Sequence, residues 1–204
     1  KRVKKSNTWK IKQHRDQFFK KSKTLGYRSR AAFKLIELNN KFKFIKKNTN
    51  LLDLGSCPGG WSQVASKLIT NGKVLSIDIK QMKPIYNVKF LHCNFFESST
   101  KDKIKNYIKE KLDVVVSDMA ADTTGNKSLD SIRTNQLCAE AINFSSEILK
   151  KDGIFISKIF MGEDFIEVKN LAKSIFKNVN FFKPKSSRKE SKETYLHCEF
   201  LKTL

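Results

Sequence analysis

Short apolar runs alternate with amphipathic helical patterns along most of the chain. The runs predict seven strands, at residues 51–54, 74–79, 88–92, 113–117, 154–160, 178–182 and 194–201. Between most of them the apolar residues recur with a helical period, as Trp61, Val64, Ala65 and Leu68 do. This alternation predicts an α/β fold of the Rossmann-like type, with a mostly parallel sheet, helices on both faces, and ligand sites beyond the carboxyl ends of the strands.

The last two predicted strands break this alternation. They are joined by KPKSSRKESKE at residues 183–193, which is basic and carries no helical pattern, so we expect an antiparallel hairpin. Earlier in the chain, the apolar periodicity between Ile132 and Leu149 predicts a long helix that ends before Gly153.

Near the start of the chain, Ser29 is expected to cap a helix that runs to about Asn40. No linker rich in Pro, Gly or Ser interrupts the sequence of 204 residues. We therefore expect residues 1–204 to form a single domain, with a basic arm at 1–30 and a catalytic core at 31–204.

The block LLDLGSCPGGW at residues 51–61 joins the first strand to a helix through a glycine turn. Its spacing differs from the G-x-G-x-x-G pattern that seats a pyrophosphate on a helix N-terminus, which disfavours a dinucleotide. Asp78 lies 23 residues after Gly55, at the end of the second strand, where it can accept hydrogen bonds from ribose hydroxyls. This combination suits S-adenosylmethionine, which carries adenosine but no phosphate. The alternative is a tight turn kept for chain geometry, with Asp78 as a surface cap.

A net charge of +21 indicates a polyanionic partner, and nucleic acid is the expected one. Residues 1–30 hold twelve Lys or Arg against one acid, Asp16, with Trp9, Phe18, Phe19 and Tyr27 interleaved. Such a segment can bind phosphates and stack on unpaired bases. For residues 1–15 the alternative is a disordered, lysine-rich tail. No apolar stretch approaches 18 residues, so we expect no membrane span.

Polar residues that interrupt apolar strands point to a site. Lys158 lies inside IFISKIF, where a lysine is costly unless it is paired or functional. Asp118 follows the strand at 113–117, which lies next to the first strand if the strand order reverses there, so Lys158 and Asp118 would face the same crevice. Glu193 begins the last strand, and Lys34 lies among apolar neighbours on the early helix.

At these residues the sequence resembles the FtsJ-type (RrmJ-like) ribosomal RNA 2′-O-methyltransferases, from about Trp9 to Leu201. The resemblance is carried by six blocks in the same order: GYRSRAAFKL at 26–35, LDLGSCPGGWSQV at 52–64, SIDIKQMKPI at 76–85, VVSDMAADTTG at 115–125, ISKIFMGEDF at 156–165 and KPKSSRKESKETYL at 183–196. The blocks resemble the bacterial and organellar large-subunit branch more than the branch that modifies the tRNA wobble ribose.

The resemblance implies a set of site residues. The family's catalytic tetrad corresponds to Lys34, Asp118, Lys158 and Glu193. Its contacts with S-adenosylmethionine correspond to Gly55, Cys57, Pro58, Gly59, Gly60, Trp61, Asp78, Asn94, Phe95 and Asp118. No metal is expected, because the four cysteines lie far apart and the three histidines do not group with them.

Two positions depart from the family pattern. Asn94 stands where the family usually has Asp, and an amide both donates and accepts hydrogen bonds, so adenine could be recognised with altered strength. Ala121 stands where the family favours Pro, which changes the loop beside the catalytic acid. Neither departure removes a tetrad member.

The implied activity is methylation of a ribose 2′-oxygen in RNA, with a uridine in the A-loop of large-subunit rRNA as the implied target and a monomer as the expected state. Two alternatives are a tRNA or mRNA-cap ribose as substrate, and a non-catalytic RNA-binding factor in ribosome assembly. Lys158 could act as a base or as a cation that orients the oxygen, since Lys34 favours the neutral form and the two acids favour the charged form.

The compartment is also open. Cysteines in apolar segments fit a reducing compartment, and the branch suggests a mitochondrion or another organelle with bacterial-type ribosomes, with the nucleus or cytoplasm as alternatives.

Overall fold

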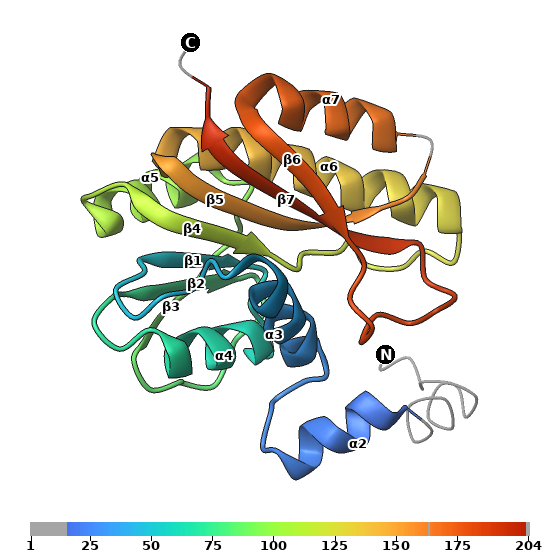
Figure 1. The fold of residues 1–204 in the computed structure, drawn as a ribbon, viewed down its shortest axis with the longest axis horizontal. Coiled ribbons are helices and arrows are strands. Elements are labelled where there is room, and N and C mark those ends of the chain that lie inside the picture. Colours follow the sequence, from blue (N-terminus) through green and yellow to red (C-terminus); the bar gives the residue numbers. More distant parts are fainter. Residues whose placement is uncertain (1–15, 163, 203–204) are drawn as a thin grey trace.

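The structure is a computed structural model that describes residues 16–162 and 164–202, and its centre is one seven-stranded sheet (Figure 1). The strand order across the sheet is β3-β2-β1-β4-β5-β7-β6. The strands are β1 (Leu51–Leu54), β2 (Val74–Asp78), β3 (Val88–His92), β4 (Leu112–Ser117), β5 (Leu149–Phe160), β6 (Phe176–Phe182) and β7 (Glu193–Leu201).

The strand directions place a crevice between β1 and β4. From β1 the chain moves outward through β2 and β3, then returns to β4 on the other side of β1, with all of these pairs parallel. β4 and β5 are also parallel, whereas β7 runs antiparallel to both β5 and β6. The predicted reversal beside the first strand and the predicted final hairpin are therefore both confirmed. Ligands are expected at the reversal, because the loops there part in opposite directions.

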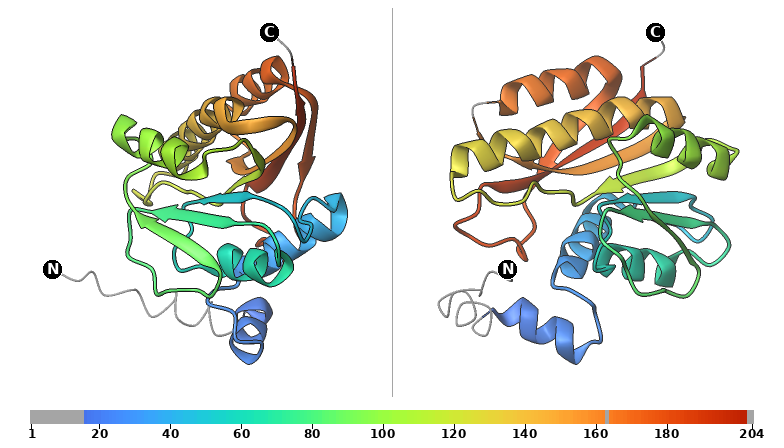
Figure 2. Two further views of the ribbon diagram at one scale, coloured as in Figure 1. Left: turned by 90° about the vertical axis from the view of Figure 1, so that its left-hand side faces the viewer. Right: turned by 180° about the vertical axis from the view of Figure 1, so that it is seen from behind.

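Helices cover both faces of the sheet (Figure 2). One face carries α3 (Ala31–Phe42) and α4 (Gly60–Leu68), and the other carries α5 (Ser98–Ile108), α6 (Lys127–Ile148) and α7 (Phe165–Ile175). Successive side chains of a strand point to opposite faces of the sheet, so one strand contributes to both apolar layers. In β4, Val114 and Val116 pack toward α3 and α4, while Val115 packs toward α6. These buried apolar residues confirm the predicted Rossmann-like α/β class.

Two predicted boundaries were wrong for the same reason. Leu68 was expected on the apolar face of its helix but is 40 % exposed, because α4 ends there and the extended Ile69 is buried instead. Ile79 was expected inside the second strand, but β2 ends at Asp78 and Ile79 is exposed at a pocket. In both places the regular element ends one residue before the hydrophobic run does.

The predicted cap at Ser29 was also wrong. The helix begins at Ala31 with Arg30 already in a helical conformation, and no side chain caps it. The Ser29 Oγ is buried against Gly60, where a Cβ would come within 2.4 Å of it. Packing of this serine on the first turn of α4 therefore replaces the expected capping bond.

A short helix, α2 (Gln17–Thr24), precedes α3 and carries part of the predicted basic arm (Figure 1). Asp16 caps it by accepting hydrogen bonds from the Phe18 and Phe19 amides. The remainder of the predicted arm, residues 1–15, lies outside the described residues. Among the helices of the described part, none has the length and apolar character needed to cross a membrane.

Candidate functional site

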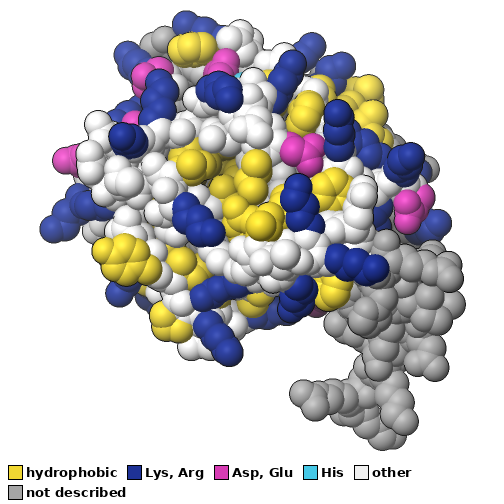
Figure 3. Space-filling view, turned by 60° about the horizontal axis from the view of Figure 1, so that its bottom comes forward, with side chains coloured by type: hydrophobic (Ala, Val, Ile, Leu, Met, Phe, Trp, Pro, Cys, Tyr) yellow, Lys and Arg dark blue, Asp and Glu magenta, His cyan; other side chains and the backbone are white. Residues whose placement is uncertain are grey.

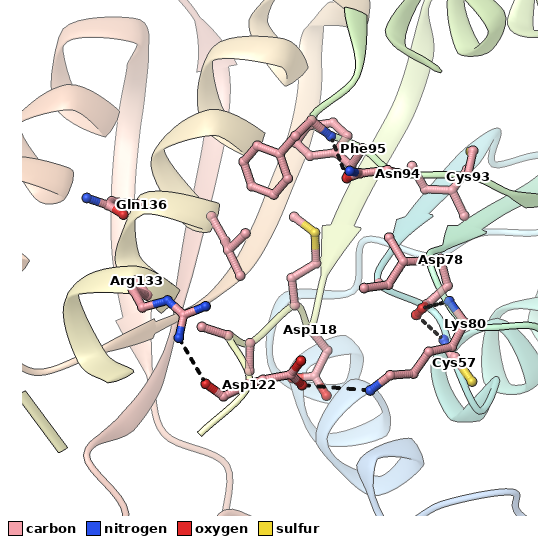
Figure 4. A pocket seen from close by; sticks show the side chains of 18 residues that line it. Cys57, Asp78, Lys80, Cys93, Asn94, Phe95, Asp118, Asp122, Arg133 and Gln136 are labelled. Carbon is pink, nitrogen blue, oxygen red and sulfur yellow. Dashed lines mark hydrogen bonds and ion pairs between the residues drawn. The ribbon is translucent and has the colours of Figure 1, made fainter. Parts of the chain in front are cut away.

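A pocket of about 610 Å³ lies at the carboxyl ends of the strands, where the order reverses. Figure 4 shows Asp78 and Cys57 on one wall and Arg133 and Gln136 of α6 on the facing wall. Its lining includes six of the residues that the family resemblance implied for the cofactor: Gly55, Cys57, Asp78, Asn94, Phe95 and Asp118. These residues come from loops after four neighbouring strands, so only the assembled sheet brings them together.

Asp78 fixes the glycine turn at the mouth of β1. Its Oδ2 accepts the Cys57 amide at 2.7 Å and its Oδ1 accepts the Lys80 amide at 2.7 Å. At Gly55, which has φ +72°, the turn passes close to Met119, and a Cβ there would come within 2.5 Å of the Met119 Cγ. The backbone of this turn can therefore approach a ligand closely, with the carboxylate beside it.

The remaining implied cofactor residues do not line the pocket. Pro58, Gly59 and Gly60 form the far side of the turn, where it enters α4. Trp61 is 2 % exposed and faces α3, donating its indole N–H to the Ala31 carbonyl at 2.8 Å. Its ring packs at 5.6 Å from that of Tyr195, which places Trp61 behind the site.

The two positions that depart from the family have local hydrogen bonds. The Asn94 Oδ1 accepts the Phe96 amide at 3.1 Å, which orients the side chain at the pocket. The Ala121 amide donates to the Thr134 Oγ1 at 3.2 Å, a bond that proline could not make. This bond ties the loop after Asp118 to α6.

The four implied catalytic residues meet beside the pocket, with alternating charges. The Lys158 Nζ lies 2.8 Å from the Asp118 Oδ1 and 3.5 Å from the Glu193 Oε2. The Lys34 Nζ lies 2.8 Å from the Glu193 Oε1. All four side chains are largely buried, with exposed fractions of 8 % for Lys158 and 16 % for Asp118. Lys158, which was expected to need a charged partner, thus has two, Asp118 and Glu193.

Burial and ion pairing have opposite effects on the pKa of Lys158. Burial alone lowers the pKa, but the carboxylates of Asp118 and Glu193 outweigh it and raise the pKa above its usual value. Burial raises the pKa of Asp118 and of Glu193, but the positive charges of Lys158 and Lys34 outweigh it and lower both pKa values. At neutral pH Lys158 is therefore a cation, and Asp118 and Glu193 are anions.

Tyr195 and Ser187 complete this cluster and were not predicted. The Tyr195 hydroxyl donates to the Asp118 Oδ1 at 2.6 Å, and the Ser187 Oγ donates to the Glu193 Oε1 at 2.8 Å. Burial raises the pKa of Tyr195 far above its usual range, so it acts as a donor. The sequence does contain a signal for Tyr195. Residues two apart on a strand share a face, so Tyr195 is expected on the same face of the last strand as Glu193.

A buried carboxyl, Asp53, lies beneath the glycine turn and also escaped prediction. It is 1 % exposed, and its Oδ2 accepts the Ser62 hydroxyl at 2.6 Å. Its Oδ1 has no hydrogen-bond partner among the residues that the structure describes. Burial raises its pKa to about 7, with a smaller contribution from Asp118. Asp53 therefore titrates near neutral pH.

Figure 3 shows a face of the molecule where Lys and Arg side chains surround a patch of hydrophobic side chains. The loop between β6 and β7 contributes the exposed Lys185, Arg188, Lys189 and Lys192. Two basic residues of the segments 1–30 and 183–193, Arg30 and Lys183, instead bind groups of the protein itself. Lys183 donates to the carbonyls of Lys189 and Ser191 within its own loop, and Arg30 pairs with Asp16 and donates to the Ser186 carbonyl.

The family model described as FtsJ-like methyltransferase matches residues 27–200. The ribosomal RNA large subunit methyltransferase E of Pelagibacter ubique (strain HTCC1062) is 48 % identical over 97 % of this chain and 97 % of its own length. The protein of that name from Rickettsia akari (strain Hartford) is 47 % identical over 96 % of this chain and 89 % of its own.

Solved structures agree with this match. A candidate ribosomal RNA methyltransferase from Plasmodium falciparum has a TM-score of 0.76 and 36 % identity, covering 86 % of this chain and 98 % of that one. Human methyltransferase-like protein 13, solved with SAH, shares the fold alone, with a TM-score of 0.58, 13 % identity, and coverage of 83 % of this chain and 79 % of that one. The chain belongs to the FtsJ-like methyltransferase family.

Proposed function

We propose that this protein transfers a methyl group from S-adenosylmethionine to a ribose 2′-hydroxyl of large-subunit ribosomal RNA. The observation that carries the proposal is the position of Lys158, whose ammonium contacts Asp118 in the wall of the pocket. A group bound in that pocket and a ribose held at Lys158 would meet at Asp118. The family model matches residues 27–200, and the four tetrad positions lie within that range.

The pocket fits S-adenosylmethionine better than a phosphate-bearing nucleotide. Three carboxylates, Asp78, Asp118 and Asp122, line it together with two basic side chains, Lys80 and Arg133. The excess of acids over bases favours a cationic ligand such as a sulfonium over an anionic one. The oxygens of Asp78 each accept one amide and retain lone pairs for the two hydroxyls of a ribose. Asn94, Phe95 and the exposed Ile79 supply polar and apolar contacts for a base.

The chemistry requires an in-line approach of a weakly acidic hydroxyl to a methyl carbon. When bound, S-adenosylmethionine supplies that methyl on a sulfonium, and the leaving group is a neutral thioether. In our proposal the Lys158 ammonium donates to the 2′-oxygen, holds a lone pair toward the methyl, and stabilises the negative charge that develops as the ribose proton passes to solvent water. The raised pKa of Lys158 supports this role over that of a base, because a base must be neutral at the start.

The other tetrad members act through position and charge. Asp118 and Glu193 hold the ammonium from two sides, and the Tyr195 hydroxyl fixes Asp118. Lys34 holds Glu193 from the helix side and is placed to contact the ribose. Because the charges balance within the cluster, a neutral hydroxyl can enter without leaving an unpaired buried charge.

The substrate is proposed from the relatives. Proteins named ribosomal RNA large subunit methyltransferase E match 96–97 % of this chain. We propose a uridine in the A-loop as the target nucleotide. The basic loop before β7 lies directly before Glu193, so an RNA backbone bound there would bring a nucleotide to the tetrad.

A substrate comparison tests the proposal. The protein would be incubated with tritiated S-adenosylmethionine and one of four RNAs: an A-loop transcript, the same transcript with 2′-deoxyuridine at the candidate position, a tRNA, and a capped mRNA fragment. We expect label in the first RNA alone. Label in the deoxy transcript would overturn the assigned atom, and label in tRNA or capped RNA alone would overturn the assigned substrate. If wild-type protein binds no cofactor in calorimetry, a non-catalytic assembly factor becomes the better explanation.

A further inference from the structure

Arg28, one of the basic residues of the segment predicted to bind RNA, binds the backbone of the protein itself. Its Nη1 donates to the Lys83 carbonyl at 2.6 Å and to the Pro58 carbonyl at 3.3 Å, and its Nη2 donates to the Pro84 carbonyl at 2.6 Å. Hydrogen bonds from a charged donor are about twice as strong as neutral ones. The guanidinium therefore joins two loops that are far apart in the sequence.

Both loops carry residues of the proposed cofactor site. One is the glycine turn at 55–59, between β1 and α4, and the other is the segment 79–87 between β2 and β3. At the pocket they are joined by the bond from the Cys57 amide to Asp78. On the side away from the pocket they are joined by Arg28. The turn is thus held from two sides, by a carboxylate within the pocket and a guanidinium outside it.

The contact between the loops is too close for an additional side chain. Gly59 has φ +106°, and a Cβ there would lie 2.8 Å from the Ile85 Cδ1, 2.9 Å from the Met82 Sδ and 3.0 Å from the Arg28 Nη1. The guanidinium thus packs against the point where the loops touch. The positive φ of Gly59 is a conformation that favours glycine, so the turn can pass this close to the 79–87 segment.

The backbone of Arg28 is itself fixed on α4. The Arg28 amide donates to the Gln63 Oε1 at 3.0 Å, and the Gln63 Nε2 donates to the Gly26 carbonyl at 2.9 Å. The next residue, Ser29, packs on Gly60. The side chain is therefore anchored at its base, and only the planar fork of an arginine presents several N–H groups to three carbonyls at once.

We propose that Arg28 is a positioning residue for the cofactor site: it holds the glycine turn and the 79–87 segment in the spacing that Asp78 and the turn need to bind adenosine. This inference rests on the proposed function above. It separates Arg28 from the lysines of α2, which were predicted to bind phosphates, although its position in the sequence puts it in the same basic segment.

Two substitutions, Arg28→Ala and Arg28→Lys, test the inference against a matched control, Lys20→Ala, which removes an exposed charge from α2. For each protein, affinity for S-adenosylhomocysteine would be measured by calorimetry without RNA. Affinity for the A-loop transcript would be measured from 50 to 300 mM salt, and kcat and KM for both substrates would be determined.

In Arg28→Ala we expect cofactor affinity to fall about tenfold or more, from the loss of charge-assisted bonds. The KM for S-adenosylmethionine should rise alongside, while RNA affinity and its salt slope stay at the wild-type values. Arg28→Lys should recover part of the cofactor affinity, because an ammonium can reach one or two of the carbonyls. Lys20→Ala should show the reverse pattern, with weaker RNA binding, a smaller salt slope and unchanged cofactor affinity.

Unchanged cofactor affinity in Arg28→Ala, with RNA binding weakened as in Lys20→Ala, would overturn the inference and make Arg28 a phosphate contact. Equal loss of cofactor affinity in both Arg28 variants, accompanied by a large fall in melting temperature, would also overturn it, since a general loss of folding is not rescued by lysine. Failure of the wild-type protein to bind S-adenosylhomocysteine would instead refute the proposed function, so the two failures are distinguishable.

Discussion

The Lys158 Nζ lies 2.8 Å from the Asp118 Oδ1, and the two residues are carried by β5 and by the end of the neighbouring β4. Parallel pairing brings the carboxyl ends of these strands to one edge of the sheet. The antiparallel β7 then brings Glu193, its first residue, to the same edge, opposite Phe160 of β5. The topology of the sheet thus explains why these charges meet.

Lys158→Ala should lower kcat by about 10³-fold or more, since it removes the group proposed to orient the 2′-oxygen and stabilise its charge. It also leaves Asp118 and Glu193 with one cation fewer, so stability should fall by about 3 kcal/mol. Lys158→Arg keeps the charge and separates the two effects: we expect near wild-type stability with low activity. Both are measured by single-turnover methylation and thermal unfolding. Wild-type activity in Lys158→Ala would refute the mechanism.

Glu193→Gln should shift the pH dependence of the reaction. Because the Glu193 carboxylate helps to raise the pKa of Lys158, its removal lowers that pKa. If the reaction needs the ammonium, the alkaline limb of the kcat profile should move to lower pH. If Lys158 instead reacts as the neutral base, the rate should rise through the pKa of Lys158, and Glu193→Gln should move that acidic limb, not the alkaline one, to lower pH.

Tyr195→Phe should have a smaller effect. The substitution removes one hydrogen bond to the buried Asp118, which costs about 1 kcal/mol of stability. The pKa of Asp118 should rise, because the Tyr195 hydroxyl contributes to lowering it. We expect kcat to fall severalfold with KM for S-adenosylmethionine nearly unchanged. A loss as large as that in Lys158→Ala would give Tyr195 a direct role in the reaction.

Asp53→Asn should stabilise the protein at pH 8 but not at pH 3.5. Below the ordinary pKa of 3.8 the carboxyl is neutral in both the folded and the unfolded chain. Between 3.8 and about 7 the unfolded chain releases a proton that the folded chain retains, so wild-type stability falls as pH rises. The full cost, on the order of 4 kcal/mol from this shift, applies above pH 7. Urea unfolding of both proteins at the two pH values measures the difference, and a constant difference would contradict it.

RNA binding should weaken steeply with salt, because the basic loop before β7 is proposed to bind phosphates, and such binding releases counterions. Lys189→Ala should lower the slope of log K against log salt by about 0.7 to 0.9. Lys151→Ala is the matched control, since this exposed lysine lies near the start of the long β5, far from its carboxyl end. Equal effects of the two substitutions would show that net charge, and not this loop, governs binding.

Much of the fold was predictable because buried strands are short apolar runs. Residues 51–54 and 88–92 form strands with the predicted bounds. The start of β5 was missed by five residues, since Lys150, Lys151 and Asp152 are exposed and polar while their backbone still continues the strand. Pairing of Leu149 with Leu112 across a register shift extends β5, and this contact depends on a neighbour that local sequence does not specify.

The amino-acid sequence by itself determined the order of strands and helices, the acids at strand ends, and the excess of positive charge, because these follow from local periodicity and composition. Only the tertiary structure decided which charges meet: Lys34 with Glu193, Lys158 with Asp118, and Arg28 with three carbonyls of the protein's own backbone. It also decided that Lys158 is charged and that Asp53 titrates near pH 7. The physical reason is that burial and distances of a few ångströms set the pKa of a group, and both arise from contacts between segments far apart in the chain.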